Sequence, residues 1–134
     1  MVDLDRRSSR LDAAESGLAV LKQSQGADDT VVSLLEGELS LARRKPAEAI
    51  PAFERARAGG LGSRAVIGLF QAKLQSAQPY PEQVLEDALA ANPDEVQVRV
   101  LAADHYLRSG EYAKSIGHYE TLVRRQPENA ALLN

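Results

Sequence analysis

The sequence predicts an all-α fold, built as a stacked array of helical hairpins, and two observations predict it. A large apolar residue followed three places on by a mostly small one recurs every 32 to 35 residues, which is how a two-helix repeat marks the inner face of its second helix. The composition is 44% hydrophobic but only 4% aromatic, so Ala and Leu carry the packing, as suits closely spaced helices. The large column is Leu18, Phe53, Leu85 and Tyr119, and the column three residues later is Leu21, Ala56, Ala88 and Leu122.

The first two helices are predicted by their apolar stripes and by the residues that end them. Apolar residues fall on one helical face from residue 10 to about residue 25, and Gly26 closes this stretch. A leucine-rich helix follows over residues 31–44. Pro46 breaks it, because proline has no backbone N–H to continue a helix.

The remaining five helices follow the same alternation of apolar stripes and breaking turns. Pro46 opens a return helix over residues 47–58, which Gly59 and Gly60 end. Pro51 lies inside this helix and removes a backbone donor, so we expect a kink or a late helix start there. Turns that contain proline or glycine separate the last four helices, expected at residues 64–77, 82–91, 95–109 and 111–125.

Composition excludes several classes of function. The net charge is −3 and the basic pairs lie far apart in the chain, so no phosphate-binding stripe for nucleic acid is expected. The chain has no cysteine, which excludes disulfides and thiolate metal sites, and no cofactor is expected. No apolar run approaches the roughly 20 residues of a membrane span, so this fragment is not expected to insert in a membrane. Both the cytoplasm and a bacterial periplasm or envelope remain open as locations.

The third hairpin resembles a tetratricopeptide repeat (TPR), a helix-turn-helix of about 34 residues with mid-helix aromatics, a turn glycine and a final proline. The residues that carry this resemblance are Tyr106, Gly110, Tyr112, Ile116, Tyr119 and Pro127. The first hairpin is similar through Gly37, Ala49, Ile50, Phe53 and Ala56. It departs from the pattern at Arg44, which holds the place of the turn glycine. The second hairpin keeps the spacing of Leu85, Ala88 and Pro93 but has Pro81 at a usual alanine position.

The resemblance implies a right-handed α-solenoid of about three TPR-like hairpins, with seven helices and a C-terminal stub. The chain would form a single repeat domain, a fragment of a longer array, because Leu132 and Leu133 are unlike the polar outer face of a terminal repeat. The phrase Leu35–Arg43 also resembles bacterial repeat proteins of exosortase and exopolysaccharide systems. The expected divisions are a half repeat at 1–29, repeats at 30–61, 62–95 (degenerate) and 96–129, and the start of another at 130–134.

The first helix of each hairpin lines the binding groove in TPR proteins, so the resemblance implies a partner-binding concave face. The expected residues are Val31, Leu34, Glu38, Leu41 and Ala42 in the first hairpin and Gln97, Val100, Asp104, Leu107 and Arg108 in the third. Glu38 and Asp104 hold the same repeat position among apolar residues, which suits a partner helix or extended peptide with a basic anchor. The alternative is solvated carboxylates beside leucines that the next repeat covers.

Other candidate residues favour structural interpretations. His105 and His118 are the only histidines, too few for a zinc site in a chain without cysteine. No nucleophile, phosphate loop or paired-carboxylate motif indicates an enzyme. Tyr80 stands between two prolines and is either a partner contact or part of a longer turn.

We therefore expect a non-catalytic scaffold that binds a peptide or helix of a partner protein, with a bacterial cell-envelope or polysaccharide-export assembly as its context. The alternatives are a structural spacer or segment that self-associates through exposed repeat ends, and an accessory domain of an enzyme elsewhere in a parent chain.

Overall fold

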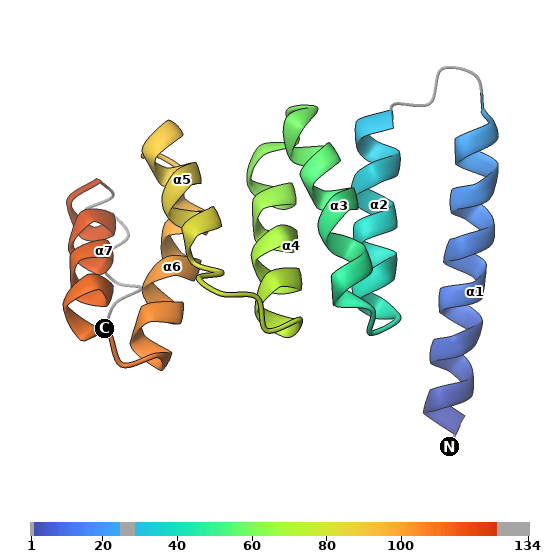
Figure 1. Ribbon diagram of the computed structural model, residues 1–134, viewed down its shortest axis with the longest axis horizontal. Helices are drawn as coiled ribbons and strands as arrows, with labels where there is room; N and C mark the ends of the chain where they lie inside the picture. The colour runs from blue at the N-terminus through green and yellow to red at the C-terminus, as the bar shows by residue number, and fades with distance from the viewer. Residues whose placement is uncertain (1, 25–28, 126–134) are drawn as a thin grey trace. The chain divides into compact units, whose positions relative to one another are not determined.

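The computed structural model describes residues 2–24 and 29–125 (Figure 1). These residues form seven α-helices and no strand, which confirms the predicted fold class. None of these helices is long and apolar enough to cross a membrane. The expected start of another repeat at 130–134 lies outside the described residues. The helices are α1 (Val2–Gln23), α2 (Asp29–Ala42), α3 (Pro46–Ala58), α4 (Gly62–Gln75), α5 (Gln83–Ala91), α6 (Val96–Arg108) and α7 (Tyr112–Arg125).

The chain divides into two compact units, residues 1–79 and residues 80–134, which are described separately. The first unit contains α1 to α4 and the second contains α5 to α7. The predicted repeat at 62–95 is therefore shared between them, with its first helix in one unit and its second helix in the other.

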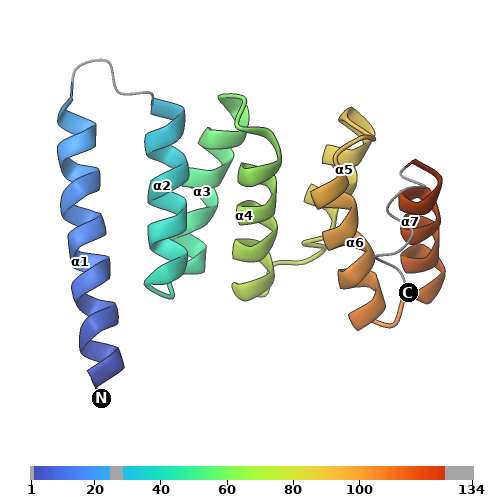
Figure 2. The same ribbon diagram turned by 180° about the vertical axis from the view of Figure 1, so that it is seen from behind.

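Phe53 on α3 is the centre of the first unit. Its side chain is fully buried, and it lies against Gly37 of α2 and Gly68 of α4. These glycines let α2 and α4 approach α3 closely, since a side chain at either position would meet the ring. The three helices lie side by side in both views of the molecule (Figures 1 and 2).

The predicted large column is only partly a core. Phe53 and Leu85 are fully buried, as expected. Leu18 on α1 and Tyr119 on α7 are half-buried. Leu18 is half-buried because it lines a hollow between α1 and α2. Tyr119 is half-buried because it lies on a face of α7 that no described helix covers, with Ile116 and Val123 exposed beside it.

Of the two alternatives predicted at Pro51, a kink or a late helix start, the late start is wrong, because α3 begins at Pro46 and runs through Pro51. Pro46 occupies the first turn, where its missing N–H would have had no partner in any case. Pro51 removes the bond that an N–H at this position would have donated to the carbonyl of Ala47, one turn earlier.

The turn after the first helix of each predicted hairpin has the same backbone structure, repeated at intervals of 33 residues. Arg44, Ala77 and Gly110 all adopt a positive φ, of 61°, 58° and 84°. In each turn, the backbone N–H of the residue directly after the positive-φ residue donates to a carbonyl five residues earlier, as in a Schellman motif. The three bonds are Lys45 N to Ser40 O at 2.9 Å, Gln78 N to Lys73 O at 2.9 Å and Glu111 N to Tyr106 O at 2.8 Å. Arg44 thus takes the conformation of the glycine that it replaces.

The second unit packs α6 between α5 and α7. Leu85 and Leu89 of α5 and Val98 and Ala102 of α6 are buried. On the other side of α6, the buried hydroxyl of Ser115 on α7 donates to the carbonyl oxygen of Ala103 at 2.8 Å. This bond satisfies a polar side chain that would otherwise cost free energy in the interior.

Candidate partner-binding faces

The five residues predicted on α2 do not form a uniform surface. Val31 is 37% exposed, whereas Leu41 and Ala42 are half-buried. Leu34 is only 3% exposed and belongs to the core of the first unit. Its side chain is therefore not available to a partner in this structure.

Glu38 is paired with an arginine that was not predicted. Nη2 of Arg64, on α4, donates to the two carboxylate oxygens of Glu38 at 2.7 and 3.1 Å, and its Nε donates at 3.3 Å. Arg64 stands 33 residues after Val31 and 33 before Gln97. It therefore occupies the same repeat position as these two predicted residues, and continuing the period through the second repeat would have found it.

An apolar hollow of about 400 Å³ lies between α1 and α2. Leu11, Leu18 and Leu21 line it from α1, and Leu35 and Leu39 from α2. Glu38 and Ala42 also line it, so these two predicted residues face α1 as well as the surface.

The five residues predicted on α6 separate into a polar row and an apolar row. Gln97, Asp104 and Arg108 are spaced by seven and four residues and so share one face of the helix. Nε of Arg108 lies 3.1 Å from Oδ2 of Asp104, one turn earlier. Val100 and Leu107 are 45% and 47% exposed and form the apolar row beside them. All five lie at least partly on the surface of the second unit.

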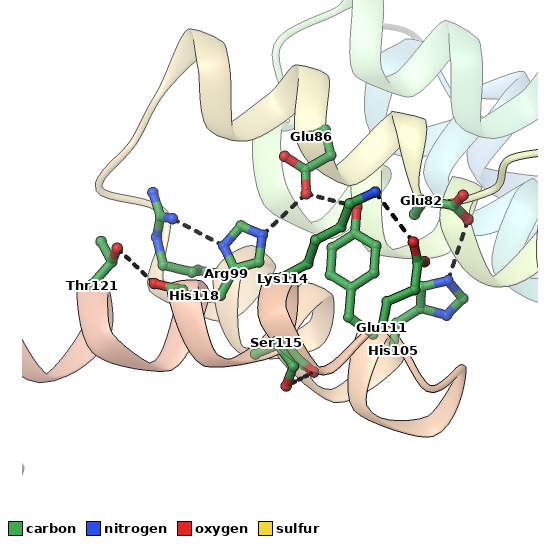
Figure 3. A network of polar contacts seen from close by, with 12 residues as sticks. Glu82, Glu86, Arg99, His105, Glu111, Lys114, Ser115, His118 and Thr121 are labelled. Carbon is green, nitrogen blue, oxygen red and sulfur yellow. Dashed lines mark hydrogen bonds and ion pairs between the residues drawn. The ribbon is translucent and has the colours of Figure 1, made fainter.

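A network of polar side chains joins the three helices of the second unit on a different side (Figure 3). Glu86 of α5 is its centre: Oε1 accepts a hydrogen bond from the hydroxyl of Tyr106 at 2.8 Å and lies 3.0 Å from Nε2 of His118. Nη1 of Arg99 lies 3.1 Å from Nδ1 of the same histidine. A guanidinium can only donate, so Nδ1 accepts and the imidazole donates its Nε2 proton to Glu86.

Tyr106 is nearly fully buried beneath this network. Burial raises the pKa of its phenol well above the usual value, and the hydrogen bond to Glu86 and the nearby carboxylates add to the effect. The ring stacks on that of His118 with centroids 5.7 Å apart, and Nζ of Lys114 lies 5.3 Å from its centroid. Tyr106 is therefore held as a neutral phenol.

Both histidines of the chain contact a glutamate at or next to the start of α5. His105 Nε2 lies 3.2 Å from Oε2 of Glu82, which directly precedes α5. No group of three or more potential metal ligands occurs within residues 2–24 and 29–125. The glutamate partners of His105 and His118 support the structural interpretation of both histidines. The sequence alone did not reveal these partners.

Tyr80 precedes α5 and is 76% exposed, with a positive φ of 51°. Together with the side chains of the network it lines an open hollow of about 580 Å³. Its role as a partner contact stays a prediction.

The comparisons with known proteins concern the second unit. Residues 82–134 match a family model described as Tetratricopeptide repeat. No curated protein and no solved structure matches the sequence. Repeats of this family generally mediate protein–protein interaction and are typically non-catalytic. The resemblance predicted from Tyr106, Gly110 and Tyr119 is thereby supported for the segment that contains α5, α6 and α7.

Proposed function

We propose that the chain is a non-catalytic TPR scaffold that binds a peptide or helix of a partner protein on an A-helix face, meaning the exposed surface of α2 in the first unit or that of α6 in the second. The observation that carries the proposal is the match of residues 82–134 to the repeat family. In addition, α2 and α6 each carry a carboxylate at the same repeat position that is paired with an arginine: Glu38 with Arg64 of α4, and Asp104 with Arg108 of α6 itself.

These ion pairs favour a partner with both a basic and an acidic group. Both pairs are substantially exposed, so each is weak in water and can be rearranged at low cost. A partner side chain that displaces Arg64 or Arg108 gains a carboxylate, and the displaced arginine remains available for a partner carboxylate. Apolar contacts beside the pairs, at Val31 and Leu41, would supply the rest of the affinity.

For the cellular context we propose a bacterial cell-envelope or polysaccharide-export assembly, which rests on the resemblance of Leu35–Arg43 alone.

The test is binding of a captured partner by matched surface variants. Val31→Arg with Gln97→Arg places a long cation at one exposed position of α2 and one of α6. Ala47→Arg with Ala90→Arg makes the same change in charge at exposed positions of α3 and α5. A partner isolated from the source cell should bind the first variant at least about tenfold more weakly than the wild type and the second unchanged. Equal binding by both variants would show that the A-helix face is not used, and a chain that captures only itself would favour the self-association alternative.

A further inference from the structure

Helix α1 packs loosely on the rest of the first unit. Of the described helices it contacts only α2, beside which it lies in both views (Figures 1 and 2). No side chain of residues 9–23 is buried, and Leu11, Leu18 and Leu21 are half-buried. By contrast, α2 and α3 each bury four residues. Helix α1 is therefore stabilised little by the burial of apolar surface.

The apolar side chains of α1 do not close against those of α2. Leu11, Leu18 and Leu21 are separated from Leu35 and Leu39 by the hollow of about 400 Å³ between the two helices. A well-packed interface leaves few spaces larger than a water molecule. The atoms around a larger space lose the contacts that they would otherwise make. A helix that filled this space would bind α2 more tightly than α1 does.

Ion pairs hold α1 on α2 at both ends of the hollow. Nη2 of Arg43 lies 3.1 Å from Oδ1 of Asp12 and 2.6 Å from Oε2 of Glu15. Nζ of Lys22 lies 2.8 Å from Oε1 of Glu36. The side chains that α1 contributes are 50% to 73% exposed, so these pairs are weak in water and are screened by salt. Nε of Arg43 is buried and makes no hydrogen bond within the described residues, which further costs the packed state free energy.

Helix α1 covers part of the α2 surface that is proposed to bind a partner. Glu38 and Ala42 line the hollow between the two helices, together with Leu35 and Leu39. All four are half-buried while α1 is in place. Departure of α1 would add the two leucines to the exposed surface of α2, beside the carboxylate of Glu38. Such a surface suits the apolar face of a partner helix.

We propose that α1 is a detachable cover: it leaves α2 while α2, α3 and α4 stay folded, and it competes with a partner for the surface of α2. Local opening is typical of an element with few buried contacts. Ionic strength shifts the balance, because salt weakens the ion pairs that hold α1. The competition with a partner rests on the proposed function, whereas the detachment of α1 is a property of the chain alone.

The test measures distances between spin labels in the whole chain by double electron–electron resonance. The chain has no cysteine, so Val20→Cys with Glu54→Cys places one label on α1 and one on α3, both at exposed positions. Glu54→Cys with Gln71→Cys, at exposed positions of α3 and α4, is the control pair. Circular dichroism checks the helicity of every variant.

We expect two populations of the α1–α3 distance, one of them longer, and a single α3–α4 distance. The ratio of the longer to the shorter population should rise at least about threefold between about 0.05 M and about 1 M sodium chloride. Arg43→Gln should raise this ratio similarly at low salt. Arg57→Gln removes the same charge at an exposed position of α3 and should leave the ratio unchanged.

A second pair of variants tests the hollow. Ala14→Leu adds apolar atoms to its lining, whereas Ala13→Leu makes the same change at an exposed position of α1 outside the lining. Ala14→Leu should lower the ratio at least about threefold, because the added side chain fills the space, and Ala13→Leu should not change it. Ala14→Leu should also weaken the binding of a captured partner, since α1 must leave α2 first.

Four results would overturn the proposal. A single α1–α3 distance at every salt concentration would show that α1 is fixed on α2. An α3–α4 distance that splits in parallel would show general unfolding. A second population that neither salt nor Arg43→Gln changes would show that the ion pairs do not control detachment. Equal partner binding by the wild type and Ala14→Leu would show that α1 does not compete with the partner.

The detachment of α1 and the proposed function can fail separately. Equal partner binding by the wild type and Ala14→Leu would leave the proposed function standing. A chain that captures no partner would refute the proposed function, whereas the label distances would still decide whether α1 detaches.

Discussion

Phe53 and Gly68 lie so close that a Cβ atom on Gly68 would come within 2.4 Å of the Phe53 ring. A Cβ on Gly37 would come within 2.8 Å of the same ring. The backbones of α2 and α4 therefore both lie directly against the ring, which leaves no room for a side chain at either glycine. This arrangement sets the distance between the helices of the first unit.

Gly68→Ala should lower the free energy of unfolding by about 1–3 kcal/mol, because the ring cannot move away from the added methyl group. Gly117→Ala is the matched control: this glycine also lies in a helix, but a Cβ there would meet nothing within 4 Å. It should stabilise by about 0.5–1 kcal/mol, since alanine is the better helix former. Urea unfolding followed by circular dichroism measures both, and a Gly68→Ala variant as stable as Gly117→Ala would refute the close packing.

Arg44→Gly and Ala77→Gly should each stabilise the protein by about 1 kcal/mol. Both residues adopt a left-handed backbone, which costs a residue with a Cβ roughly 1–2 kcal/mol that glycine does not pay. Gly110→Ala, at the third equivalent turn, should cost a similar amount, although no neighbour would clash with its Cβ. Thermal and urea unfolding of the three variants test this, and a loss of stability in Arg44→Gly would contradict it.

Tyr106 should make the protein sensitive to alkali. Its pKa is raised in the folded state, whereas in the unfolded chain the phenol ionises near pH 10. Below that pH both states hold the proton and stability does not depend on this group. As the pH rises above about 10 toward the folded-state pKa, the unfolded state loses its proton first, and stability falls by up to about 1.4 kcal/mol per pH unit.

Tyr106→Phe should be less stable than the wild type at pH 7, by about 1–2 kcal/mol, because Glu86 loses a hydrogen-bond donor. Its stability should fall less steeply above pH 10. Tyr112→Phe, at an exposed tyrosine, should change neither the stability at pH 7 nor the steepness of its fall above pH 10. Urea unfolding between pH 8 and 11 gives the slopes, and equal slopes for wild type and Tyr106→Phe would contradict the raised pKa.

The Glu38–Arg64 pair should contribute less than about 1 kcal/mol to stability, since its side chains are 39% and 64% exposed. A double-mutant cycle of Glu38→Gln and Arg64→Gln measures the coupling, which should shrink with added salt. A coupling above about 2 kcal/mol would mean that the pair is a fixed structural element and is not free to rearrange for a partner.

Most of the fold could be predicted because its signals are local. Apolar periodicity and the breakers Gly59 and Pro46 placed the helix ends within a few residues of those observed, except that α1 begins at Val2. The conformation of Arg44 followed from its place in the repeat. The burial of Leu18 and Tyr119 could not be read from their shared column, because it depends on whether a neighbouring helix covers them.

The site was predictable only in part because it depends on which helices meet. Leu34 and Val100 hold one repeat position, yet the first is 3% exposed and the second 45% exposed. The pairs Glu82–His105 and Glu86–His118 join residues 23 and 32 positions apart. No periodicity in a single sequence indicates such pairs, which the packing of α5 on α6 and α7 creates.

The most direct test of the proposed scaffold is photo-crosslinking from single positions in the presence of a captured partner. A photoreactive residue at Gln97, on the A-helix face of α6, should form a crosslink to the partner that excess unlabelled chain competes away. The same residue at Ala90, exposed on α5, should form none. Crosslinks from Ala90 but not from Gln97 would contradict the account, because the partner would then bind away from the A-helix face.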